Sequence, residues 1–157
     1  MIVVADTSPL LHLARIGRLE LVPAVAGRVT IPRTVWAELV HPGTRPDVVQ
    51  AIEAADWIEV VDDPVAIELG LDPGETAAIL LAEKLLADAI IIDERRGRAI
   101  AAARGLSVIG TLGIIAGARR KGVLDQASPV VTQLRGDGFW LSDAVVAEFL
   151  SGLGETA

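Results

Sequence analysis

The chain contains no cysteine and no tyrosine, and it has only two histidines and two phenylalanines. The absence of cysteine excludes disulfide bonds and thiolate zinc sites, and it fits a cytoplasmic location. Two histidines are too few for a histidine-rich metal site. Because tyrosine and phenylalanine are so scarce, aromatic readout of nucleic-acid bases is not expected to dominate. The three tryptophans, Trp36, Trp57 and Trp140, are interpreted as core or interface residues rather than as platforms for base stacking.

Long hydrophobic runs and a signal sequence are also missing. Hydrophobic residues make up 52% of the chain and the mean hydropathy is +0.50. The longest apolar region, Thr76–Ile92, is nevertheless interrupted by charged residues, so it does not predict a membrane helix. The N-terminal apolar run lacks a preceding basic segment and carries Asp6, which argues against a secretory signal. The length of 157 residues suits one domain, predicted at 1–151 with a flexible tail at 152–157.

The charges are distributed unevenly along the chain. The net charge of −7 argues at first against nucleic acid as a partner. From Arg95 to Lys121, however, there are seven basic residues and no acidic one. This basic segment could hold an anion such as a phosphodiester backbone, with Arg95 and Arg96 as candidate phosphate contacts. The alternative is a solvated face of two helices, and the charge pattern alone does not separate the two interpretations.

Two apolar runs each end in an aspartate and then lead directly into a predicted helix. Ile2–Ala5 precedes Asp6, and Ala89–Ile92 precedes Asp93. Apolar runs of this kind are typical of parallel strands that are buried on both faces. The residue after such a strand lies at the carboxyl edge of the sheet, where open α/β folds place their sites. Two carboxylates at one edge suggest a site for a hard metal ion.

Strand and helix patterns alternate through the whole chain. This alternation predicts an α/β fold with a mainly parallel central sheet and helices on both faces. Strands are predicted at 2–5, 28–31, 57–61, 90–92 and 107–110, with an extended piece at 139–141. Helices are predicted at 9–16 (capped by Ser8), 19–25, 32–40, 47–55, 72–87, 94–104, 112–121, 128–134 and 143–150.

Four acidic residues stand out in this frame: Asp6, Glu38, Glu75 and Asp93. Each alone has an ordinary structural explanation. Asp6 and Asp93 could accept hydrogen bonds from the helices that follow them, and Glu38 could be a solvated helix residue. Glu75 fits a variant of the capping box, in which a glutamate at the third helical position returns to the cap. The hypothesis of a site therefore depends on the set of four, ordered along an α/β frame.

The donor types in this set favour particular ions. Carboxylates without nearby cysteine or histidine suit Mg²⁺ or Mn²⁺ better than zinc. Such an ion would polarise a phosphoryl oxygen and lower the pKa of an attacking water. Thr7 and Thr111, each predicted at a strand end, could hold a metal-bound water or a phosphate oxygen. Simple capping of the next helix is an equally good explanation for both threonines.

The chain resembles a known family at several motifs. They are Asp6-Thr7-Ser8, Glu38, Gly74-Glu75-Thr76-Ala77-Ala78, Ile91-Ile92-Asp93 and the block Val108-Ile109-Gly110-Thr111-Leu112-Gly113. Together they resemble PIN-domain ribonucleases, especially the VapC-like toxins of toxin–antitoxin pairs, over nearly the whole chain. Glu75 stands where these toxins more usually have aspartate, and Asp93 is followed by Glu94-Arg95-Arg96.

The resemblance implies a function that composition and spacing do not. Asp6, Glu38, Glu75 and Asp93 would form an acidic pocket that binds Mg²⁺ or Mn²⁺ for hydrolysis of RNA. A small antitoxin protein would be the partner, and a homodimer is expected. Receiver, dinucleotide-binding and haloacid-dehalogenase-like folds lack their required residues, such as a Gly-x-Gly-x-x-Gly after the first strand. The remaining alternative is a PIN-like module that binds RNA or protein without cleaving.

Overall fold

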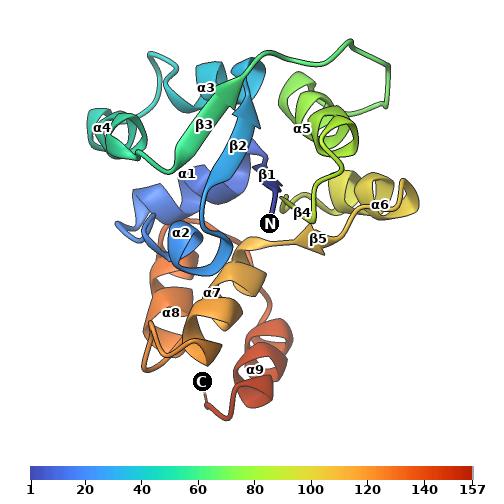
Figure 1. The fold of residues 1–157 in the computed structure, drawn as a ribbon. Helices are drawn as coiled ribbons and strands as arrows, with labels where there is room; N and C mark the ends of the chain where they lie inside the picture. Colours follow the sequence, from blue (N-terminus) through green and yellow to red (C-terminus); the bar gives the residue numbers. More distant parts are fainter. Residues whose placement is uncertain (157) are drawn as a thin grey trace.

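A parallel sheet of five strands organises the protein (Figure 1). The computed structural model describes residues 1–156, and every strand pairing in it is parallel. The spatial order is β3-β2-β1-β4-β5. The strands are β1 (Val3–Ala5), β2 (Val29–Pro32), β3 (Ile58–Val61), β4 (Ala89–Ile91) and β5 (Val108–Ile109).

The strand order reverses direction between β1 and β4. The chain builds outward from β1 to β2 and β3, and then returns to add β4 and β5 on the other side. Ala5 pairs with Ile91, and the Asp6 N–H donates to the Ile91 carbonyl at 2.8 Å. The segments that follow β1 and β4 therefore leave the sheet side by side at its carboxyl edge. Open α/β sheets bind ligands at such a switch point.

Helices cover both faces of the sheet, as the alternating pattern predicts. In Figure 1, α5 and α6 lie on one side of the sheet and α1 to α4 on the other. The α/β fold class is confirmed. The helices are α1 (Thr7–Arg15), α2 (Leu21–Ala26), α3 (Arg33–Leu39), α4 (Pro46–Ala54), α5 (Pro73–Lys84), α6 (Arg95–Ala103), α7 (Thr111–Arg120), α8 (Ser128–Gly136) and α9 (Asp143–Gly152).

The two central strands are apolar because both of their faces are covered. Every residue of β1 and β4 is buried, and Val4, Ile90 and Ile91 have no exposed surface. α5 contacts β1, β2 and β4, and most of its residues are buried as well. Burial of apolar surface is the main stabilising contribution here, and it contributes about 25 cal/mol of free energy for each Å². The rigid centre therefore lies directly beneath the edge where Asp6 and Asp93 emerge.

α1 starts two residues earlier than its sequence pattern predicts. The pattern favours Ser8 as the N-cap, but Asp6 takes that position with extended backbone angles of φ −83° and ψ 171°. The physical reason is that β1 ends at Ala5, and the chain turns at once into the helix. No side-chain hydrogen bond caps α1. α1 ends as predicted before Gly17, whose φ of 72° places it in the left-handed region that favours glycine.

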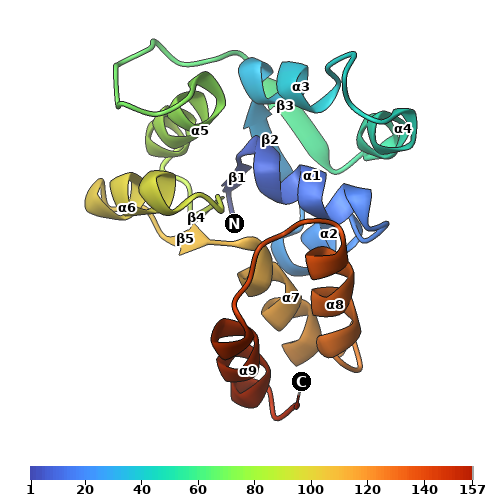
Figure 2. The same cartoon turned by 180° about the vertical axis from the view of Figure 1, so that it is seen from behind.

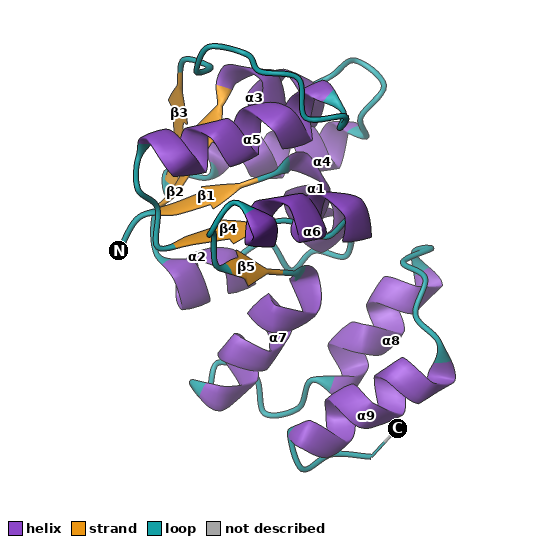
Figure 3. Cartoon of the chain, turned by 90° about the vertical axis from the view of Figure 1, so that its right-hand side faces the viewer, coloured by secondary structure: helices purple, strands orange, loops and turns teal. Residues whose placement is uncertain are grey.

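The last three helices lie beyond the β5 edge of the sheet (Figure 3), and α7 also packs against α2 and α1. The segment between α8 and α9 arches from one helix to the other (Figure 2), and the extended piece predicted at 139–141 forms no strand. Glu155 accepts hydrogen bonds from the N–H groups of Ala127 (2.8 Å) and Ser128 (3.1 Å). The predicted tail therefore contacts α8, and its flexibility stays a prediction. Ala157 lies outside the described residues.

Within residues 1–156, no helix is long and apolar enough to cross a membrane. This agrees with the charged residues that interrupt the longest apolar region.

Candidate metal and nuclease site

Asp6 and Glu38 meet at the carboxyl edge of the sheet. Asp6 follows β1 and is only 3% exposed, and Glu38 comes from the last turn of α3. Thr7 links the two acids, because it follows Asp6 in the chain and its Oγ1 donates to Glu38 Oε2 at 2.8 Å. Glu38 is half-buried rather than a freely solvated helix residue. Thr7 thus orients the Glu38 carboxylate.

Asp93 is held at the same edge by the start of α7. Its Oδ1 accepts from the Thr111 N–H at 2.7 Å, and its Oδ2 accepts from Thr111 Oγ1 at 2.6 Å. Asp93 therefore caps α7 rather than α6, the helix that follows it in sequence. His12 Nε2 of α1 lies 3.9 Å from Asp93 Oδ2. Two hydrogen bonds and a neighbouring imidazole fix the direction of this carboxylate.

Glu75 is the most unusual acid of the four. It is 4% exposed, and its Oε2 is buried with no hydrogen-bond partner among the described residues. Half of the predicted capping box forms, since the Glu75 N–H donates to Asp72 Oδ1 at 2.8 Å. The other half does not form among the described residues, because the Glu75 carboxylate accepts no hydrogen bond from the Asp72 N–H. A buried oxygen left without a partner is costly, so it calls for a ligand that the protein itself does not supply.

Two further acids complete the cluster. Asp72, Glu75 and Glu94 each offer one oxygen, and these oxygens lie within 4.8 Å of one another. The sequence pattern predicts Asp72 only as part of a helix cap, and it gives Glu94 no role in the site. The signal for Glu94 is its place directly after Asp93. Asp72 could have been found from its position, because an N-cap residue three positions before Glu75 lies next to it at the start of the same helix.

The electrostatics show that these acids share one environment. The pKa of Asp6 is raised to about 7, mainly by burial and also by the negative charges of Asp72, Glu38 and Asp93, while a backbone hydrogen bond from Thr7 lowers it. Burial likewise raises the pKa of Glu75 to about 8, with Asp72, Asp6 and Glu94 adding to the effect. The pKa of Glu38 is also raised, mainly by burial.

An oxygen-liganded divalent cation fits this donor set. The ligand atoms present are carboxylate oxygens, which Mg²⁺, Mn²⁺ and Ca²⁺ prefer. A cation would satisfy the unpaired Glu75 Oε2 and favour the charged forms of Asp6 and Glu75, whose pKa values are raised by burial and by the neighbouring acids. The oxygens of Asp72, Glu75 and Glu94 are close enough to share one ion, and the remaining acids of this group of six, Asp6, Glu38 and Asp93, interact with them or with one another through their charges.

Two glycines leave room for the carboxylates. A Cβ at Gly74 would collide with the Glu38 carboxylate. A Cβ at Gly97, in the first turn of α6, would lie 2.5 Å from Glu75 Oε2 and 2.8 Å from Ile92 Cδ1. Neither glycine has a positive φ, so close approach and not backbone conformation explains them. Gly97 in particular lets α6 lie against the buried end of Glu75.

We expect Gly97→Ala to weaken metal binding although alanine is the better helix former. Alanine gains about 1 kcal/mol over glycine in a helix interior. Here the added methyl group must displace the Glu75 carboxylate or the Ile92 side chain, and displacement of Glu75 moves a metal donor. The expected result is at least a tenfold loss of Mn²⁺ affinity, measured by isothermal titration calorimetry.

Gly136→Ala provides the matched control for this substitution. Gly136 ends α8, has no positive φ, and has no atom within 4 Å of a built Cβ. Its alanine variant should be as stable as the wild type or slightly more stable, with unchanged Mn²⁺ affinity. Equal Mn²⁺ affinity in wild type and Gly97→Ala would show that Glu75 does not hold the ion.

The basic segment does not form one continuous surface. Arg104 pairs with Glu83 at 2.6 Å, Arg119 pairs with Glu155 at 3.2 Å, and Lys121 donates to two backbone carbonyls of α2. Arg95 and Arg96 are exposed in the first turn of α6, next to Glu94 of the acidic cluster. Fewer basic side chains therefore face the acidic cluster than the charge pattern of the sequence suggests.

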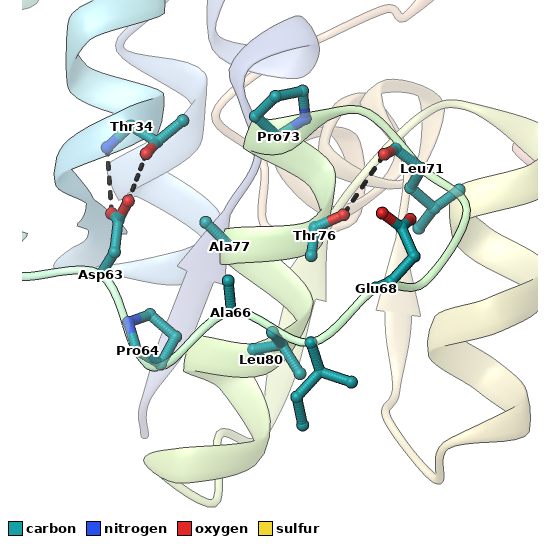
Figure 4. Close-up of a pocket in the computed structure, with 11 residues that line it drawn as sticks. Thr34, Asp63, Pro64, Ala66, Glu68, Leu71, Pro73, Thr76, Ala77 and Leu80 are labelled. Carbon is teal, nitrogen blue, oxygen red and sulfur yellow. Dashed lines mark hydrogen bonds between the residues drawn. The ribbon is translucent and has the colours of Figure 1, made fainter.

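A cavity of about 330 Å³ lies on the flank of α5, apart from the acidic cluster (Figure 4). Its walls come from α5, the start of α3 and the segment 63–71. Several polar groups in this lining are already engaged. Thr34 donates twice to Asp63, Thr76 donates to the Leu71 carbonyl, and Glu68 accepts from Gly70 N–H. The remaining surface is mainly apolar, so the cavity offers shape rather than catalytic groups.

The family of the chain agrees with this geometry. Residues 2–155 match the family DUF3368, described as a PIN domain, so the chain belongs to the PIN-domain family. PIN domains are typically nucleases that use divalent metals, and the acidic cluster is consistent with such a site.

One solved structure similar to the chain is the PilT N-terminus domain protein SSO1118 of the hyperthermophilic archaeon Sulfolobus solfataricus P2. The TM-score is 0.55 at 17% identity, over 75% of this chain and 93% of that one. At this identity the similarity supports the fold alone. Among curated proteins, none matches the chain.

Proposed function

We propose that the protein is a metal-dependent ribonuclease of the VapC-like type, the toxin of a toxin–antitoxin pair. The observation that carries the nuclease proposal is Glu75 Oε2, which is buried and unpaired beside the carboxylates of Asp72 and Glu94. Buried polar atoms usually have a hydrogen-bond partner, so this unpaired oxygen favours a bound cation. The toxin role and the choice of RNA come from the sequence motifs.

Asp6, Glu38, Glu75 and Asp93 would hold Mg²⁺ or Mn²⁺, with Asp72 and Glu94 beside them. A bound ion of this kind polarises a phosphoryl oxygen and lowers the pKa of the water that attacks phosphorus. The protein's own contribution is to prepare the donors before the substrate arrives.

Hydrogen bonds orient two of the proposed donors, and the raised pKa of Glu75 makes metal binding depend on pH. Thr111 holds Asp93 through two hydrogen bonds, and Thr7 holds Glu38 through one. With a pKa of about 8, Glu75 carries a proton at neutral pH when no cation is bound. Binding of a cation must release that proton, so metal affinity should increase with pH between about 6 and 8.

The direct test is cleavage of RNA by the purified protein. A single-stranded RNA oligonucleotide and total RNA are each incubated with Mn²⁺, with Mg²⁺ and with EDTA, and the products are separated on a denaturing gel. Cleavage with the metals and none with EDTA is the expected result. If RNA is bound in filter-binding assays but stays intact with both metals, the domain is a non-catalytic binding module.

Arg95 and Arg96 are proposed to contact RNA phosphates. Both are exposed in the first turn of α6, close to the acidic cluster. The double alanine variant should bind RNA more weakly whatever its sequence, and the slope of log affinity against log salt should fall by about 1 to 2. Arg120→Ala, at the exposed end of α7, is the matched control and should leave the slope unchanged. An unchanged slope in the double variant would place the RNA backbone elsewhere.

The toxin proposal also requires partners. An antitoxin would cover or fill the acidic cluster, plausibly with an arginine, because a guanidinium pairs well with buried carboxylates. We also propose a homodimer. Co-expression with the adjacent small gene followed by pull-down tests the antitoxin, and analytical ultracentrifugation tests the dimer. If no neighbouring product co-purifies, a solitary nuclease or an RNA-processing enzyme becomes the better assignment.

A further inference from the structure

The segment between α8 and α9 carries an exposed tryptophan. Four of the five aromatic side chains, Trp36, Trp57, Phe139 and Phe149, are partly buried against the hydrophobic core. Trp140 is 84% exposed. Of the two roles expected for Trp140, core or interface, this exposure excludes the core, because the backbone turns its side chain outward where Phe139 turns inward. A large apolar ring left in water is costly unless something covers it during function.

The backbone beside Trp140 is fixed to the helix that leads from the acidic cluster. The Phe139 ring packs edge-to-face on the His12 ring of α1, with centroids 4.8 Å apart and an interplanar angle of 87°. Arg15 of α1 pairs with Asp137 at 3.0 Å. The same His12 places Nε2 3.9 Å from Asp93 Oδ2. A short chain of contacts thus connects the segment to a proposed metal donor.

We propose that Trp140 is a stacking platform for one nucleobase of a single-stranded RNA whose phosphodiester lies at the acidic cluster. This inference rests on the proposed nuclease function and specifies its substrate as single-stranded. Only an unpaired base has a face free to stack on a protein side chain. The bases of a duplex are already covered by their neighbours.

The surroundings of Trp140 favour a nucleobase over a protein partner. A protein interface usually presents a contiguous apolar patch. The immediate chain neighbours of Trp140, Phe139 and Leu141, are partly buried against the hydrophobic core, so Trp140 is the one strongly exposed ring of the segment and not part of an exposed apolar run. A single exposed flat ring matches a single base, which also presents a flat π-face.

The negative charges of that segment do not prevent the approach of RNA. Asp137 is paired with Arg15, and Asp143 is paired with Arg135 at 2.8 Å. Both carboxylates are thus compensated by arginine. The two ion pairs and the Phe139–His12 contact also hold the segment in place before RNA binds, so little ordering entropy is lost on stacking.

The test compares variants of Trp140 in binding to a fluorescein-labelled 12-nucleotide single-stranded RNA. Fluorescence anisotropy is measured with Ca²⁺ in place of Mg²⁺, and a gel confirms afterwards that the RNA is intact. Trp140→Ala should weaken binding about tenfold, and Trp140→Phe should recover most of the loss. The same RNA annealed to its complement should bind wild type and Trp140→Ala equally.

Leu86→Ala is the matched control. Leu86 is 86% exposed, similar to Trp140, but it lies between α5 and β4 at the opposite edge of the sheet. It should bind the single strand as the wild type does. Equal binding by Trp140→Ala, with wild type still cleaving RNA, would overturn the stacking inference while the nuclease proposal stands. A wild type that neither binds nor cleaves RNA would overturn both. If Trp140→Ala changes the sedimentation coefficient and leaves RNA affinity unchanged, Trp140 is a protein contact.

Discussion

Asp6→Asn and Asp93→Asn should each reduce RNA cleavage by more than about a hundredfold. Loss of a residue that only supports a metal ligand typically costs 10 to 100-fold in metal affinity or activity, and loss of a donor should cost more. Asparagine keeps the size of the side chain but removes its negative charge. At position 93 it can still accept from the Thr111 N–H, so α7 should keep its cap. The measurement is the initial rate of cleavage with saturating Mn²⁺.

Circular dichroism and a neutral variant separate chemistry from folding. Both asparagine variants should give the wild-type spectrum. Glu59→Gln removes an exposed carboxylate from β3, on the outer strand of the sheet and away from the cluster, and it should cleave at the wild-type rate. Should Asp6→Asn and Asp93→Asn both cleave as fast as Glu59→Gln, the carboxyl edge is not the active site.

The sequence alone predicts most of this fold because its patterns are local. The runs Val3–Ala5 and Ala89–Ile92 are apolar because two layers of helices cover them, and this burial is visible as uninterrupted hydrophobicity. The start of α1 is predicted less well. Ser8 and Pro9 form a strong local start signal, but the end of β1 places the turn at Asp6. Tertiary position overrides the cap preference there.

The site is predicted in part, and the missing part depends on contacts distant in sequence. Asp72 and Glu94 each have a plausible local role, as a cap and as an exposed residue before a helix. Only the approach of α5 to α6 shows that both lie beside Glu75. Gly97 could not be assigned for the same reason, since its closest neighbour is a carboxylate 22 positions away.

Surface charge and exposure are predicted least well. A run of basic residues in the sequence suggests one patch, but the side chains of Arg104 and Arg119 turn to acids on different elements. Trp140 is similar, because hydrophobicity favours burial and only the path of the α8–α9 segment shows that it is exposed. Periodicity indicates which residues face a core, but not which of the remaining residues face one another.

Asp6 and Glu75 should make the metal-free protein less stable as the pH rises from about 4 to 8, and metal should reverse this loss. Asp6 has a folded pKa of about 7 against 3.8 for the ordinary group, and Glu75 has about 8 against 4.5. Between these values the folded state binds more protons than the unfolded state, so the free energy of unfolding falls with rising pH. Their favourable contribution is complete below about pH 4 and is lost above pH 8.

Asp6→Asn isolates this effect in thermal melts with EDTA. Asparagine does not titrate, so the variant should match or exceed the wild-type melting temperature at pH 8, and the difference should shrink or reverse at pH 4. Comparing the two proteins at each pH cancels other titrating groups. Glu155 is one of these, because the Ala127 N–H lowers its pKa and its stabilising effect is lost at low pH instead. A sharp drop in the melting temperature of Asp6→Asn at pH 8 would make Asp6 a structural residue.

Addition of Mn²⁺ completes the experiment at pH 8. A ligand that binds only the folded state adds RT ln(1 + [L]/Kd), about 2.7 kcal/mol at a hundredfold excess over Kd. For a chain of this size, that corresponds to roughly 5 to 10 °C in melting temperature. Wild type should show this increase, and Asp6→Asn should show less because one donor has lost its charge. Glu59→Gln should respond as wild type does. If the melting temperature of wild type ignores Mn²⁺, the unpaired Glu75 oxygen is not a metal donor, and the six acids are a source of strain without a cation to relieve it.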